Sequence, residues 1–220
     1  MSSVATGYGL QPYNLTGGQP NNGGVIREIR VAANNAAAIF NGDLVVLSSA
    51  GLPSAVSSSP VAVKIPSTSA DATPGIIGIC VGARYINPST KQPIWNNFLP
   101  ANTITGGATD VWLQVMDDPD MLFKVKGTAA LGTFNSGTSG SGWPGAIGKN
   151  TTLTFNAGST TTGLSGVVAT VGTNGATLAA TSTLAVRIVD VVRGTESDTF
   201  PEFIVRLNVG VHAYYNSLGV

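Results

Sequence analysis

The strongest structural signal lies near the end of the chain, where Leu184-Ala185-Val186-Arg187-Ile188-Val189-Asp190-Val191-Val192 is followed by Glu202-Phe203-Ile204-Val205-Arg206-Leu207-Asn208-Val209. Both runs are rich in Val and Ile, and polar residues recur between the apolar ones. This composition and this alternation are typical of β-strands with one buried face. The two runs therefore predict two adjacent strands of a β-rich protein.

Further strand signals occur along the rest of the chain. Asn41-Gly42-Asp43 is a hairpin signal and predicts a hairpin between residues 36–40 and 44–47. Other short apolar or alternating runs lie at 25–31, 61–65, 75–82, 111–116 and 121–126. Together these runs predict an all-β fold, a barrel or sandwich of about nine or ten short antiparallel strands.

Glycine and proline divide the chain into regions. Residues 1–24 are rich in both and predict an extended N-terminal arm, whose anchors Tyr8, Leu10 and Tyr13 favour ordering on a neighbouring subunit over a frayed end. Residues 25–220 are expected to form a single β-rich domain. Two long loops are expected within it, at 86–110 and 132–150.

Composition excludes several classes of protein. Of 220 residues only 10% are charged, and 11 Lys and Arg balance 11 Asp and Glu, so the basic excess needed for nucleic-acid binding is absent. Glu is too scarce for a helical bundle, and the single cysteine, Cys80, allows no intrachain disulfide. The apolar runs fall far short of the roughly 20 residues that span a bilayer, and residues 1–24 lack the pattern of a signal peptide. We therefore expect a protein made in a cytoplasm, without membrane contact, whose sparsely charged surface suits packing against other subunits.

No catalytic pattern stands out. His212 is the only histidine, and no Gly-x-Ser-x-Gly motif presents a serine nucleophile. One histidine and one cysteine cannot complete a tetrahedral metal site, and the glycine spacing in 145–151 differs from that of a phosphate-binding loop. The acidic residues of 117–120 are interpreted as a turn, with a structural calcium site as the alternative. We expect no enzyme activity and no cofactor.

Four stretches of the sequence resemble the decoration, or cement, proteins that coat the capsids of tailed bacteriophages. They are Gly9-Leu10-Gln11-Pro12 with Pro20-Asn21-Asn22-Gly23, then 38–45, then 111–125 as a central hairpin, and finally 162–166 with 184–188. The resemblance covers most of the chain, and its motifs are structural. It implies a β-rich virion protein, located on the capsid exterior, that binds the major capsid protein and stabilises the assembled shell.

Exposed aromatic residues on arms and loops are the expected contacts with the capsid or with other subunits, because aromatic side chains dominate interface energetics. Such contacts would join the chain to the shell and to copies of itself, as a homotrimer or homodimer. Ordinary core packing is the alternative for Trp95 and Phe98. A receptor- or glycan-binding module of a head or tail fibre is the alternative function. The candidate contact residues are Tyr8, Leu10, Tyr13, Trp95, Phe98, Trp143, Tyr214 and Tyr215.

Overall fold

The computed structural model describes residues 6–18, 26–31, 35–48, 61–64, 75–132 and 142–215. These residues form an all-β protein, which confirms the predicted fold class. Ten strands of four or more residues and three of two residues occur in this part of the chain, with one short helix, α1 (Gly142–Ala146), and one 3-10 turn, η1 (Thr173–Gly175). No helix in the described ranges is both long and apolar enough to cross a membrane.

The first sheet has five strands in the order β1-β8-β13-β12-β9. The two C-terminal runs form its centre as an antiparallel pair, with Val186 opposite Leu207 and Ile188 opposite Val205. Alternation then places Phe203, Val205 and Leu207 in the core. The strands are β1 (Gln11–Leu15), β8 (Met121–Lys126), β9 (Asn150–Thr151), β12 (Val186–Val191) and β13 (Glu202–Leu207).

The second sheet has six strands, in the order β2-β7-β5-β3-β4 with β6 also paired to β5. Its longest strand, β5, has 11 residues and pairs with β7 on one side and with β3 and β6 on the other. The strands are β2 (Ile26–Arg30), β3 (Leu44–Ser48), β4 (Val61–Lys64), β5 (Ile76–Ile86), β6 (Pro93–Asn96) and β7 (Thr109–Met116). The remaining strands, β10 (Leu153–Thr154) and β11 (Val168–Ala169), pair with each other.

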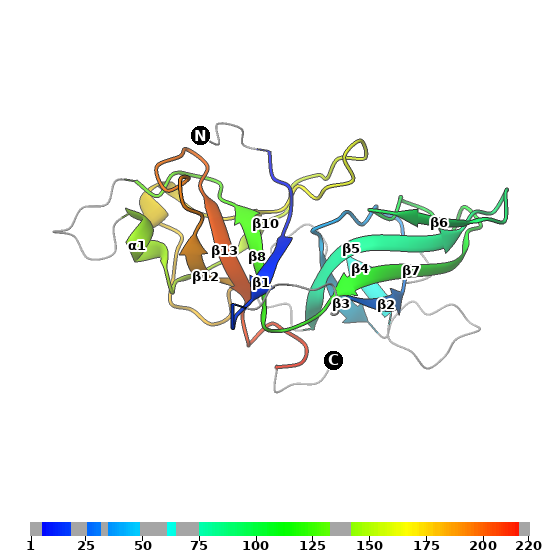
Figure 1. Cartoon of the computed structure of the whole chain (residues 1–220), viewed down its shortest axis with the longest axis horizontal. Coiled ribbons are helices and arrows are strands. Elements are labelled where there is room, and N and C mark those ends of the chain that lie inside the picture. Colours follow the sequence, from blue (N-terminus) through cyan, green and yellow to red (C-terminus); the bar gives the residue numbers. More distant parts are fainter. Residues whose placement is uncertain are drawn as a thin grey trace.

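The two sheets lie side by side along the long axis of the molecule (Figure 1). The turn at residues 117–120 joins β7 of the six-stranded sheet to β8 of the five-stranded sheet. The turn itself is therefore as predicted, whereas the expected central hairpin over 111–125 is wrong, because the strands on either side of the turn belong to different sheets.

Residues 6–18 of the predicted arm dock on the chain's own body, with an extended strand at Gln11–Leu15 followed by a turn. Strand β1 pairs with β8 and adds an edge to the five-stranded sheet, with Gln11 opposite Lys124. Leu10 is fully buried, and its amide donates to the carbonyl oxygen of Gly42 at 3.1 Å. In this range the arm packs against its own chain. The expected boundary at residues 24 and 25 lies outside the described residues.

The Asn41-Gly42 turn forms, but it does not make the predicted hairpin. The Asp43 amide donates to the Phe40 carbonyl oxygen at 3.0 Å, and Gly42 takes a φ of 88°, which favours glycine. Beyond the turn, Ile39 bridges to Leu99, whereas β3 pairs with β4 and β5. Non-local pairing thus replaces the local hairpin.

The predicted loops contain some regular structure. Within 86–110, strand β6 pairs with β5, placing Trp95 opposite Arg84. Pro93 opens this strand, and proline is tolerated there because β6 lies at the edge of the sheet. The described part of 132–150 includes helix α1 and the start of β9; residues 133–141 lie outside the described residues.

Candidate functional site

A row of alternating aromatic and cationic side chains crosses the six-stranded sheet. Arg30 on β2 lies opposite Trp112 on β7, Trp112 lies opposite Arg84 on β5, and Arg84 lies opposite Trp95 on β6. Directly opposed residues of an antiparallel pair project from the same face, so these four side chains share one surface. Trp95 at the edge of the row is the most exposed large apolar residue in the described chain, at 64%.

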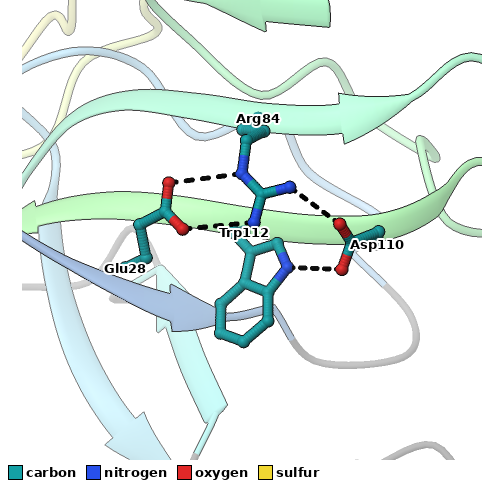
Figure 2. Close-up of polar contacts among 4 residues, drawn as sticks. All are labelled: Glu28, Arg84, Asp110 and Trp112. Carbon is teal, nitrogen blue, oxygen red and sulfur yellow. Dashed lines mark hydrogen bonds and ion pairs between the residues drawn. The ribbon is translucent and has the colours of Figure 1, made fainter. Parts of the chain in front are cut away.

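Two carboxylates hold Arg84 in the centre of this row (Figure 2). Its Nε and Nη2 each donate to the Glu28 carboxylate at 3.2 Å, and its Nη1 donates to Asp110 Oδ2 at 2.7 Å. The indole Nε1 of Trp112 donates to the other Asp110 oxygen at 2.6 Å. The bond from Trp112, together with Arg84, lowers the pKa of Asp110, and the bonds to Glu28 and Asp110 raise the pKa of Arg84. Both pKa shifts favour the ionised forms of Asp110 and Arg84.

The indole of Trp112 is flanked by cations. The Arg30 guanidinium carbon lies 4.5 Å from its ring centroid and that of Arg84 lies 5.7 Å away, both within cation–π range. Trp112 is therefore engaged within the sheet, whereas Trp95 remains the exposed aromatic of the row.

A second group of aromatic residues closes the junction between the two sheets. The hydroxyl of Tyr214 donates to Asp117 Oδ2 at 2.6 Å, and that of Tyr215 donates to Asp120 Oδ2 at 3.4 Å. Arg27 forms an ion pair with Asp117 and lies over the Tyr214 ring at 5.4 Å. The acidic turn thus anchors the C-terminal segment. In the described ranges no three His, Cys, Asp or Glu side chains come together as a metal site.

His212 lies beneath these tyrosines. It is 1% exposed, and its Nδ1 accepts from the Tyr214 amide at 3.2 Å. Burial lowers its pKa to about 4 against the opposing effect of the Asp118 charge, so the ring is neutral at pH 7. Burial also raises the pKa of Asp117, although Arg27 opposes that shift. This histidine supports the packing of the C-terminal segment, because its ring contacts those of Tyr214 and Tyr215 at centroid distances of 5.2 and 6.0 Å.

The eight candidate contact residues fall into three groups. Tyr13, Trp95, Trp143, Tyr214 and Tyr215 are exposed, between 39% and 64%. Tyr8 and Phe98 are half-buried: Lys124 Nζ lies 5.3 Å from the Tyr8 ring, and Phe98 stacks on Phe40 at 5.3 Å. Leu10 belongs to the chain's own core and has no exposed surface, and its amide donates to the Gly42 carbonyl oxygen. In this conformation the side chain of Leu10 offers no surface to another subunit.

The eight residues do not form one site. The structure instead places them on several surfaces: Trp95 on β6, Trp143 on α1, Tyr13 on β1, and Tyr214 with Tyr215 at the junction. Sequence reasoning missed the Arg84 group, whose residues come from three strands, and the exposed aliphatic residues Ile147 and Val209. Aromatic residues in loops could be predicted as contacts from the sequence. Exposed aliphatic residues could not, because the sequence does not distinguish an exposed isoleucine or valine from a buried one.

Comparisons with known proteins give no match: no family model, no curated protein and no solved structure matches this chain.

Proposed function

We propose that the chain is a structural protein of a tailed-bacteriophage virion, which binds the outer surface of the assembled capsid and stabilises the shell. The observation that supports this function best is the wide separation of its exposed aromatic side chains. Helix α1, with Trp143, and strand β6, with Trp95, lie at opposite ends of the long axis (Figure 1). A subunit bound to a lattice contacts several neighbours at once, and such a distribution provides a contact at each end.

The low charge of the chain fits the same role. An interface centre is depleted in charged residues and enriched in aromatic ones, because burying an unpaired charge is costly. With 10% charged residues and a net charge of zero, the chain can bury a large part of its surface at modest electrostatic cost. Several such contacts acting together would give strong binding from individually weak interfaces.

The proposed partners are the major capsid protein and further copies of this chain, as a homodimer or homotrimer, at the capsid exterior. Direct binding to nucleic acid is not proposed, because the balanced charge provides no electrostatic drive towards phosphate groups. The proposed role requires no catalysis and no cofactor.

The test is co-sedimentation of the purified chain with empty shells assembled from the major capsid protein of the same virus. We expect stoichiometric binding in many copies per shell, and weaker binding by Trp95→Ala and Trp143→Ala. Trp112→Phe is the matched control, because Trp112 lies between two arginines and is not offered as a contact. If Trp95→Ala and Trp143→Ala bind shells as strongly as the wild type and Trp112→Phe do, Trp95 and Trp143 are not contacts with the shell.

A receptor- or glycan-binding fibre module is the competing function. It would be favoured if the chain formed a stable oligomer that ignored shells and was retained on immobilised glycans. In that case the exposed indole of Trp95 would stack on a sugar ring, and Trp95→Ala would abolish retention on the glycan instead of binding to the shell.

A further inference from the structure

Two arginines face each other on the five-stranded sheet. Arg187 on β12 lies directly opposite Arg206 on β13. Like charges in this position repel each other, and a side-chain pair of this kind destabilises the sheet unless another group compensates. The chain has only 11 Lys and Arg residues among 220, so a directly opposed pair of arginines is not a consequence of a high density of cations.

The charges of this pair are poorly neutralised within the described chain. Arg187 donates from Nε to the Asn150 amide oxygen at 3.0 Å, and it forms no ion pair among the described residues. Arg206 has one acidic neighbour, Asp120, at 3.7 Å, and the side chain of Asp120 is 55% exposed. By contrast, Arg84 in the other sheet is held by two carboxylates, at 2.7 and 3.2 Å.

The two arginines line a common pocket of about 90 Å³. Its other lining residues are Ser182, Asn208, Val209 and Gly210. In the described turns, the backbone amides of Val209 and Gly210 donate no hydrogen bond, so both remain available as donors. Two arginines, a serine and an asparagine thus line a space that would hold a single small group.

We infer that this pocket is an oxyanion-binding site, in which Arg187 and Arg206 together hold a carboxylate or phosphate group. Guanidinium groups bind such planar or tetrahedral oxyanions through paired, charge-assisted hydrogen bonds, and a bound anion converts the repulsion between the arginines into attraction to a shared ligand. The oxyanion can come from a free inorganic ion or from an acidic side chain of a partner protein. The site does not depend on the proposed shell-binding role.

The experiment titrates the full-length chain with inorganic phosphate at constant ionic strength and follows backbone amide and arginine Nε–H signals by NMR. We expect saturable shifts at Asn208, Val209, Gly210 and the two arginine side chains. Arg187→Gln and Arg206→Gln should each weaken the apparent affinity by about tenfold or more, the effect of losing one charge-assisted contact. Arg193→Gln is the matched control, an exposed arginine outside the pocket, and it should leave the titration unchanged.

A parallel titration uses acetate and then a short peptide containing aspartate, to distinguish the two sources. Displacement of phosphate by acetate and by the peptide would identify a protein carboxylate as the ligand, whereas binding of phosphate alone would identify a free anion. Non-saturable shifts, or shifts that survive in both pocket variants, would overturn the site. Because each variant removes one of two repelling charges, its spectrum should remain dispersed, which verifies folding in the same measurement.

Discussion

The two sheets bury their apolar faces in different ways. The buried residues of the six-stranded sheet's core, built around Leu113 and Val115, lie between 29 and 115, and Ala213 from the C-terminal region packs against them. The core beneath the five-stranded sheet collects residues from Leu10 to Val211, almost the full length of the described chain. The six-stranded sheet is thus assembled mainly from one region of sequence, whereas the five-stranded sheet forms only when the N-terminal and C-terminal regions meet.

The same strands nevertheless serve both cores. On β3, Leu44 contributes to one core and its neighbour Val45 to the other; on β7, Met116 and Val115 divide in the same way. Successive residues of a strand point to opposite faces, so a strand near the junction can be buried on both sides. Two sheets with separate cores are thus held together by strands that are buried on both faces.

The largest expected effect tests this coupling. Phe203 is fully buried beneath the five-stranded sheet, and Phe203→Ala should lower the free energy of unfolding by about 3–5 kcal/mol, because it removes a large side chain and leaves a cavity. If the shared strands couple the sheets, hydrogen exchange should accelerate in β5 and β7 of the other sheet as well as in β12 and β13. Acceleration confined to the five-stranded sheet would show that the two sheets unfold independently.

The next effect concerns the N-terminal contribution to the five-stranded sheet. Leu10→Ala should lower the free energy of unfolding by about 2–4 kcal/mol, because Leu10 is fully buried. Tyr13→Ala, three residues further on at a side chain that is 47% exposed, is the control and should change it by about 0.5 kcal/mol or less. Denaturant unfolding of both variants measures the difference; equal, small effects would mean that the segment does not belong to the core.

The junction should respond to acid through His212. Burial lowers its folded pKa to about 4 from the ordinary 6.5, so the unfolded chain takes up a proton at higher pH than the folded chain. The contribution of His212 to stability is therefore complete above pH 6.5, falls as the pH decreases towards 4, and amounts to at most about 3 kcal/mol. The free energies of unfolding of the wild type and of His212→Asn, compared at pH 7 and pH 4.5, measure this contribution. The pH dependence should be weaker in the variant, and an identical slope would contradict this role of His212.

The smallest effect concerns the ion-paired row on the six-stranded sheet. Asp110→Asn removes one of the two carboxylates that hold Arg84 and should cost about 0.5–1 kcal/mol, because the pair is partly exposed to solvent. The pKa of Asp110 is lowered, so its contribution is present above its ordinary value of 3.8 and is lost as the pH falls through the lowered value. A double-mutant cycle with Arg84→Gln isolates the coupling between the two side chains. A coupling energy of zero would show that the ion pair between Asp110 and Arg84 does not contribute to stability.

Much of the fold was predictable from local patterns, and the exceptions have physical causes. Strands β8, β12 and β13 follow directly from alternation in the sequence. Strand β6 was missed because the three prolines of 86–110 and its polar residues favour a loop, and only pairing with β5 makes residues 93–96 a strand. The predicted hairpin at Asn41-Gly42 is wrong because the turn residues specify the bend but not the strand with which each flanking segment pairs.

The sequence predicted which residue types would be exposed, but not the surface on which each candidate contact residue lies. Aromatic residues in glycine- and proline-rich segments were expected to be exposed, and Tyr13, Trp95 and Trp143 are. Leu10 carries the same signal in the sequence but is buried, since burial depends on the turn at Gly42 that covers it. The opposition of Arg187 and Arg206 depends on the register of two strands joined by a long connection, which no local pattern specifies.

The all-β class, the low charge and the strand-forming segments could be inferred without a structure, because they follow from composition and from the two-residue period of a strand. Only the tertiary structure decided that the chain divides into two sheets across the Asp117–Asp120 turn, that the N-terminal segment docks on its own body, and which side chains share a surface. The physical reason is that strand partners and register are set by contacts between residues far apart in the chain, and alternation within one strand is the same whichever partner it meets.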